Sequence, residues 1–281
     1  MPPSPVPTVA LAHGARMPRL GLGTWPLDDR TVQGVVEQAV GLGYRLVDTA
    51  HNYGNERGVG AGLRASGLPR EELFVTTKFN KNSHSVRGVR RAAEQSVRRL
   101  GVDYLDLLLI HWPNPGRDRY VEAWRGLIEL LKAGDVRAIG VSNFKRAHLE
   151  RLLAETGVAP DVNQIQLDPR LARVQVRAYH AQHDIVTEAW SPLGAGTGLL
   201  DDPVIIAIAA RHDRTPAQVV LRWHLDLGLV VVPKSASPAR LAENIDVFGF
   251  TLSDGDIAAI SALDRGAAGE AAALDSDTFG H

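Results

Sequence analysis

The chain has 281 residues, enough to bury a core as one large α/β domain or as two small ones. Its 31 Lys and Arg residues nearly balance its 32 Asp and Glu residues, so no overall field favours nucleic acid, a membrane surface or acidic partners. The absence of Cys excludes thiolate catalysis, cysteine-ligated metals and disulfides, and it fits a chain that needs no oxidising compartment.

Residues 1–7 are rich in Pro and predict a loose, polyproline-like start, within an N-terminal tail or hairpin that reaches residue 15. This start has no basic region followed by an apolar run, as a signal peptide would have. No apolar run in the chain approaches the ~18 residues of a membrane span. We therefore expect a cytoplasmic monomer that contacts neither membrane nor nucleic acid and whose partner is a small molecule.

Short apolar runs rich in Val, Leu and Ile alternate with longer segments of helical periodicity, which is typical of repeated βα units around a parallel sheet. Helices are predicted over residues 29–41, 86–100, 119–132 and 145–155, several of them closed by Gly as a C-cap. The eight predicted strands are 20–23, 46–48, 74–77, 105–110, 138–141, 163–166, 185–189 and 229–232.

Eight strands with eight helical connections match a (β/α)8 TIM barrel of about 250 residues. The competing doubly wound sheet usually has a Gly-x-Gly-x-x-Gly turn after its first strand, and the run from Gly21 to Pro26 lacks the third glycine. No linker divides the chain. We expect one barrel domain over residues 1–281, with two extra helices near 202–211 and 253–263 and a short C-terminal tail at 266–281.

Polar residues stand at or just beyond the ends of successive predicted strands. In a barrel these carboxyl ends lie on one face, where active sites are built. Any one such residue could simply end a strand, but the full set is hard to explain in that way. Its members are Asp48, Lys78, His111, Asn143, Gln164, Trp190 and Lys234.

Tyr53 is the candidate proton donor of this face. The ordinary pKa of a tyrosine is about 10, so donation near neutrality needs a nearby cation that stabilises the phenolate. Lys78 is predicted to be that cation, with Asp48 holding its ammonium group and His111 pointing an imidazole N–H at the oxygen that is protonated. Taken singly, these residues could also be a packing tyrosine, a structural ion pair and a core histidine.

Four segments resemble the aldo-keto reductases, in order and with the spacing of that family. They are Gly21-Leu-Gly-Thr-Trp25, Asp48-Thr-Ala-x-x-Tyr53-Gly-Asn-Glu56, Val141-Ser-Asn-Phe144 and Pro233-Lys-Ser235. The chain is most similar to bacterial NADPH-dependent members of the 2,5-diketo-gluconate reductase type. The resemblance implies reduction of an aldehyde or ketone by hydride from the nicotinamide, with Tyr53 as general acid.

The same resemblance assigns cofactor residues. Ser142, Asn143 and Gln164 match the residues that hold the nicotinamide carboxamide. Trp190 matches the aromatic residue that stacks on the nicotinamide, where Tyr is more common; a flat π face serves equally well. Because Lys234 and Arg240 match the contacts of the adenosine 2′-phosphate, the chain should prefer NADPH over NADH. The remaining implied contacts are Thr24, the loop residues Ser191, Leu193 and Gly194 near the pyrophosphate, Ser235 at the 2′-phosphate, and Glu243 and Asn244 at the adenine.

The expected substrate pocket is an aromatic wall with a few polar groups, which would accept many carbonyl compounds. Large C-terminal specificity loops of the family are missing from the sequence. The pocket residues are Trp25, His51, Asn52, Phe79 and Trp112, with Trp190 at the edge.

Two other functions remain open at this point. One is a subunit that binds NADPH and senses redox state without turnover. The other is an aldolase-type barrel that uses Lys78 as a Schiff-base nucleophile, although pairing with Asp48 should keep that lysine protonated.

Two weaker patterns carry no function in this interpretation. His180 and His183 have no carboxylate or Cys partners that would complete a metal site, so we expect no metal. We expect the arginine series from Arg87 to Arg99 to form a solvated helix face.

Overall fold

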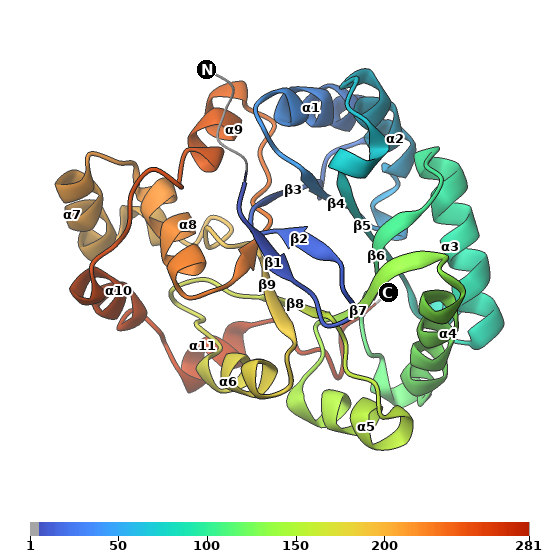
Figure 1. Cartoon of the computed structure of the whole chain (residues 1–281). Helices are drawn as coiled ribbons and strands as arrows, with labels where there is room; N and C mark the ends of the chain where they lie inside the picture. The colour runs from blue at the N-terminus through green and yellow to red at the C-terminus, as the bar shows by residue number, and fades with distance from the viewer. Residues whose placement is uncertain (1–5, 281) are drawn as a thin grey trace.

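Eight parallel strands form the centre of the protein, which the computed structural model describes over residues 6–280. Each strand from β3 to β10 pairs with the next in the chain, and a bridge between Leu20 and Val231 brings the two edges of the sheet together. The helices surround this nearly closed barrel (Figure 1). The arrangement confirms the predicted (β/α)8 fold class.

The strand positions agree with the prediction to within two residues at either end. Residues 46–48 and 105–110 coincide with their strands. The strands are β3 (Gly21–Gly23), β4 (Leu46–Asp48), β5 (Phe74–Phe79), β6 (Leu105–Ile110), β7 (Val136–Ser142), β8 (Val162–Gln166), β9 (Val186–Trp190) and β10 (Val230–Val231).

Capping residues set the helix boundaries that the sequence predicts. The Asp28 carboxylate accepts the backbone N–H groups of Arg30 and Thr31 and begins α1, and Gly101, at a φ of 65°, ends α3. Predicted helices 29–41 and 86–100 coincide with α1 and α3, and the next two differ by one residue. The helices are α1 (Asp29–Gly41), α2 (Glu56–Ala65), α3 (Val86–Leu100), α4 (Tyr120–Ala133), α5 (Arg146–Thr156), α6 (Val174–Gln182), α7 (Pro203–His212), α8 (Pro216–Asp226), α9 (Pro238–Ile245), α10 (Asp254–Ser261) and α11 (Ala267–Ala272).

The apolar core has two parts. The larger fills the layer between the strands and the surrounding helices. The smaller lies inside the barrel and is built mainly from strand residues, several of them at the beginnings of strands, such as Leu46, Phe74 and Val230, together with Leu11 and Met17. Side chains thus fill the amino end of the barrel, and the polar groups are left to the carboxyl end.

The N-terminal segment forms a hairpin, one of the two forms expected for it, whereas the C-terminal tail contains more structure than the sequence indicated. The hairpin β1 (Thr8–Ala10) and β2 (Arg16–Pro18) supplies Leu11 and Met17 to the barrel interior, whereas the loose start predicted for residues 1–7 lies mostly outside the described residues. The extra helices are present as α7 and α10. The tail expected at 266–281 contains α11 and ends in a segment whose Asp275 carboxylate lies 2.6 Å from the ammonium of Lys145.

Candidate active site

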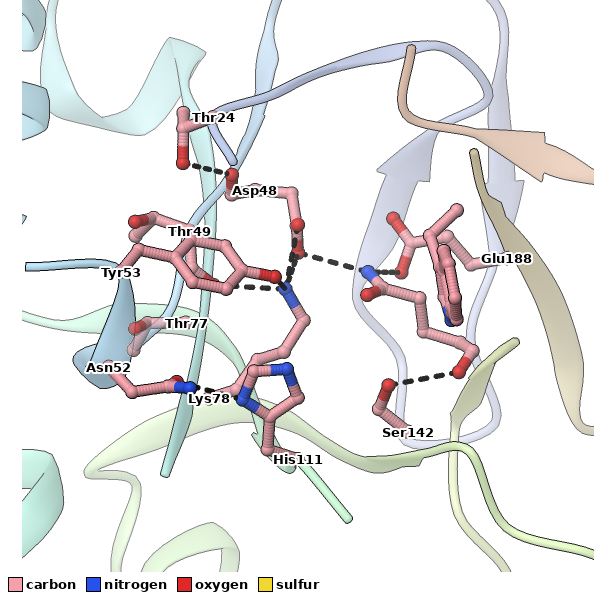
Figure 2. Close-up of polar contacts among 12 residues, drawn as sticks. Thr24, Asp48, Thr49, Asn52, Tyr53, Thr77, Lys78, His111, Ser142 and Glu188 are labelled. Atoms are coloured by element: carbon pink, nitrogen blue, oxygen red, sulfur yellow. Dashed lines mark hydrogen bonds and ion pairs between the residues drawn. The ribbon is translucent and has the colours of Figure 1, made fainter. Parts of the chain in front are cut away.

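Asp48, Tyr53, Lys78 and His111 meet at the carboxyl end of the barrel (Figure 2). Lys234 of the predicted set lies apart from them, exposed before α9. Asp48 is the last residue of β4, Lys78 lies near the end of β5, and His111 directly follows β6. Tyr53 comes from a short 3-10 helix, His51–Tyr53, in the loop after β4. Parallel strands in this register place all four side chains around one point.

Lys78 and Asp48 form a buried ion pair. The Lys78 ammonium nitrogen lies 2.7 Å from each Asp48 carboxylate oxygen and donates to the Thr49 carbonyl at 3.0 Å. Lys78 is fully buried and Asp48 is 4% exposed. Burial by itself lowers the pKa of Lys78, but its negative neighbours, Asp48 foremost, raise it to about 12. Lys78 is therefore a permanent cation here.

Tyr53 lies against this cation. Its hydroxyl oxygen is 3.4 Å from the Lys78 nitrogen, which is 5.1 Å from the centre of the tyrosine ring. Burial raises the pKa of Tyr53, and the Lys78 charge opposes that effect without overcoming it. The sequence pointed to the correct cation, but the expected lowering of the phenol pKa is wrong for this structure. Tyr53 therefore keeps its proton: its hydroxyl oxygen accepts from the Lys78 ammonium, and its O–H remains available to donate.

His111 completes the group. Its ring meets the Tyr53 ring edge-on at 5.7 Å between centres. Nδ1 of His111 lies 3.0 Å from the amide oxygen of Asn52. This contact holds the imidazole ring in place, and the tautomer of the ring sets which of its nitrogens donates.

The residues expected at the nicotinamide form a connected layer beside Asp48. Trp190 Nε1 donates to Asn143 Oδ1 at 2.9 Å, Asn143 Nδ2 donates to Ser142 Oγ at 2.9 Å, and Ser142 Oγ donates to the Gln164 carbonyl at 3.0 Å. Asn143 takes a left-handed φ of 64°, which turns the chain at the end of β7. Trp190 is half-buried and lines a cavity.

Glu188 is a member of this site that sequence reasoning missed. It is fully buried, and its Oε2 accepts from Gln164 Nε2 at 2.8 Å, while the same nitrogen donates to Asp48 at 2.9 Å. Residues two apart on a strand share a face, so the placement of Trp190 at the site was a signal that Glu188 also points inward.

The residues expected at the adenosine end lie around the start of α9. Lys234 and Arg240 are exposed, and neither forms an ion pair within residues 6–280. Asn244 is buried on the same helix. Glu243 accepts from the Thr215 hydroxyl at 2.5 Å, which occupies one of its carboxylate oxygens. The remaining residues of this group, Ser235 and the loop 191–194, precede α9 and follow β9 respectively.

Three of the five expected pocket residues gather at Tyr53 and His111. The Trp25 ring centre is 5.2 Å from that of Tyr53, Asn52 binds His111, and Trp112 stacks beside His111 at 6.3 Å. The other two are engaged elsewhere. Phe79 is 2% exposed within the core, and Nδ1 of His51 contacts the guanidinium of Arg99 at 2.7 Å.

The C-terminal tail forms a wall of the site that the sequence did not indicate. The Phe279 ring meets that of Trp112 at 4.8 Å, and the Lys81 ammonium donates to the Gly280 carbonyl at 3.2 Å. A cavity of about 420 Å³ lies between Asn143 and Trp190 on one side and residues 270–276 on the other. The tail therefore limits the space at the carboxyl end of the barrel.

Two patterns outside the site have structural partners. His180 is buried and bonds to Asn163 and Thr187, and the described part of the chain has no group of three His, Asp or Glu side chains that could hold a metal. The predicted solvated arginine face is partly wrong, because Arg99 turns inward to the buried Glu56 carboxylate at 2.5 Å.

No helix among residues 6–280 is long and apolar enough to cross a membrane.

Comparison with known proteins gives concordant matches. A model described as the Aldo/keto reductase family matches residues 19–265. The chain is 48% identical over 276 residues to methylglyoxal reductase DkgA of Escherichia coli (strain K12), with 98% of each chain covered. It is 49% identical over 263 residues to an aldo-keto reductase of Mycobacterium avium, covering 94% of this chain and 92% of that one. A crystal structure of a Gox0644 mutant in complex with NADPH superposes with a TM-score of 0.93 at 47% identity, over 98% of this chain and 99% of the other.

Proposed function

The chain belongs to the aldo/keto reductase family, and we propose that it reduces the carbonyl group of a small aldehyde or ketone to an alcohol, with Tyr53 as the proton donor. The observation that carries this proposal is the position of the Tyr53 hydroxyl, 3.4 Å from a buried, permanently charged Lys78. The cofactor is NADPH, in keeping with the family and with the NADPH complex of a similar structure.

The side chains around the site fit that cofactor. Lys234 and Arg240 are two exposed cations without ion-pair partners among residues 6–280, and together they suit a dianionic phosphate. At the other end, Trp190 offers a flat ring, and Asn143 and Gln164 offer amide groups to a carboxamide. When bound, NADPH supplies hydride to the carbonyl carbon.

Tyr53 supplies the proton in this proposal. As the carbonyl oxygen gains negative charge, it becomes a stronger base and takes the proton from the tyrosine hydroxyl. The phenolate that remains is stabilised by the Lys78 ammonium, which Asp48 holds in place from its other side. His111 orients the carbonyl oxygen beside that hydroxyl. A Schiff-base role for Lys78 is disfavoured because a nucleophilic amine must be neutral, whereas the pKa of Lys78 is raised to about 12.

The substrate class follows from the walls of the pocket. Trp25 and Trp112 supply aromatic surface, Phe279 closes one side, and Asn52 and His111 are the polar groups. A small aldehyde or dicarbonyl compound suits such a site, and a relative at 48% identity carries the name methylglyoxal reductase.

Tyr53→Phe tests the proposal. It should abolish carbonyl-dependent oxidation of NADPH, followed by absorbance with a panel of aldehydes, and leave the dissociation constant of NADPH close to that of the wild type. Unchanged turnover in the variant would rule out Tyr53 as the acid. A wild-type protein that binds NADPH but reduces no carbonyl in the panel would instead favour a redox-sensing subunit.

A further inference from the structure

Glu188 is a buried carboxyl group without an obvious structural task. It lies on β9 with no exposed surface, and only its Oε2 has a hydrogen-bond partner, Gln164. Its other oxygen, Oε1, has none within the part of the chain that the structure describes. Leaving a buried polar atom unpaired costs about 1–3 kcal/mol, so a compensating role is to be expected.

The amide of Gln164 is held from two sides. Its nitrogen donates one hydrogen to Asp48 Oδ1 at 2.9 Å and the other to Glu188 Oε2 at 2.8 Å; Figure 2 labels these two carboxyl groups. An amide nitrogen has only two hydrogens, and both are used. Gln164 Oε1 makes no hydrogen bond in the described chain. The only group that Gln164 can offer to a ligand is therefore a carbonyl oxygen.

We propose that Glu188 is a positioning residue that fixes the Gln164 amide so that its oxygen, and not its NH2 group, faces the carboxamide of the nicotinamide ring. This inference rests on the proposed function for its ligand. With Asp48 alone, the amide would keep one bond and could rotate to use its nitrogen elsewhere. Glu188 acts through Gln164 and touches neither the hydride nor the proton that moves.

The charges around Glu188 make this arrangement depend on pH. The groups that face it are Asp48 from β4, Lys78 from β5, Tyr53 from the loop after β4, and Gln164 from β8. Lys78 is thus the one cation among these groups, beside the two buried carboxyl groups of Asp48 and Glu188. Burial first, and the Asp48 charge second, raise the pKa of Glu188 to about 8. Below that pH, Glu188 accepts from Gln164 as a neutral acid. Above that pH, Glu188 is ionised and adds a second negative charge beside that of Asp48.

Two consequences follow for cofactor binding. The added charge above about pH 8 should weaken binding of the anionic cofactor, and a variant that cannot ionise should lack this effect. An apolar side chain at this position should weaken binding by about tenfold at neutral pH, which is the equivalent of about one hydrogen bond.

The experiment compares Glu188→Gln, which keeps an acceptor for Gln164 and cannot ionise, with Glu188→Met, which removes the acceptor. Thr187→Val is the matched control, because it removes a buried hydroxyl on the same strand that bonds to His180. NADPH dissociation constants are measured by quenching of tryptophan fluorescence from well below to well above about pH 8. The carboxylic acid C=O band is followed by infrared difference spectroscopy over the same range.

We expect Glu188→Gln to bind NADPH like the wild type at neutral pH, to lose the alkaline weakening and to lack the infrared band. Glu188→Met should bind about tenfold more weakly, and Thr187→Val should bind normally. Equal affinity of wild type and Glu188→Met would overturn the proposal, and so would an alkaline weakening that persists in Glu188→Gln. If Glu188→Met fails to fold, Glu188→Ala, which also removes the acceptor, takes its place, and equal NADPH affinity of that variant and the wild type overturns the proposal. None of these readouts needs turnover, so failure of the proposed reductase activity is seen separately.

Discussion

Replacing Lys78 by Met should destabilise the protein by about 4 kcal/mol at pH 7. Met matches Lys as far as Cε and lacks the ammonium group that lies 2.7 Å from both oxygens of Asp48. Asp48 is 4% exposed, so water cannot replace the lost cation. The carboxylate must then either remain charged in a dry site or take up a proton.

Both outcomes predict a similar loss of folding stability. Breaking a buried pair by removing one partner typically costs about 3–5 kcal/mol. Protonating a carboxyl group with an ordinary pKa of about 3.9 costs about 1.4 kcal/mol for each pH unit above that value, which is about 4 kcal/mol at pH 7. Because the protein adopts whichever state of Asp48 costs less free energy, the cost of protonation is an upper limit on the loss of stability. It agrees with the first estimate.

The pH dependence separates this mechanism from simple loss of packing. In Lys78→Met the folded state binds a proton that the unfolded chain does not, so stability falls as pH rises, by up to about 1.4 kcal/mol per unit. In the wild type the pKa of Lys78 is raised to about 12, above its ordinary value of 10.5. The stability that this residue contributes is therefore fully present below about pH 10.5 and is lost only as the pH rises through about 12.

Urea denaturation at pH 7 and at about pH 5 measures the effect, provided that unfolding is two-state. The matched control is Arg90→Met, which removes the cation of an ion pair whose side chains are 48% and 46% exposed and should change stability by less than about 1 kcal/mol. Combining Lys78→Met with Asp48→Asn should recover much of the loss because no unpaired charge remains at this pair. A loss for Lys78→Met that equals that of the control, or that is the same at both pH values, would refute the reasoning.

Three further predictions concern ligand binding. Arg240→Ala should weaken NADPH by about tenfold or more, the equivalent of a charge-assisted hydrogen bond, and leave NADH unaffected; equal losses in titrations of the two cofactors would contradict the 2′-phosphate contact. Trp190→Ala should weaken NADPH binding in fluorescence or calorimetric titrations, whereas Trp190→Tyr should retain it because a flat ring remains, and a similar loss in both would exclude stacking. Phe279→Ala should raise KM for aldehydes without changing the NADPH dissociation constant, since this ring contacts Trp112; an unchanged KM would show that the tail does not border the substrate.

The fold and the grouping of Asp48, Tyr53, Lys78 and His111 could be predicted because they depend on local patterns. Alternation of apolar runs with helical periods identifies βα units whichever distant segments they meet, and parallel strands then place their carboxyl ends together. Lys78 and His111 stand at the ends of strands, where the pattern indicates a site. Asp48 and Lys78 needed only the pairing of neighbouring strands to come within 2.7 Å.

Other parts of the site depend on contacts between distant segments. Phe279 contacts Trp112 only because the tail folds back over the barrel. Arg99 turns inward because it forms an ion pair with the buried Glu56. The same contact draws His51 toward Arg99 and away from its expected place in the pocket. No periodicity along the chain encodes such contacts.

Tyr53 illustrates which properties the sequence determines and which depend on the tertiary structure. The sequence by itself determined the barrel, the identity of the phenol and the cation that faces it, because all of these follow from residue type and strand order. Only the tertiary structure decided the protonation of the site. Burial of the Tyr53 hydroxyl outweighs the charge of Lys78, and Glu188 joins Asp48 through Gln164, a residue 116 positions from Asp48 in the chain. Desolvation depends on every group packed around an atom, and that environment exists only once the barrel has closed.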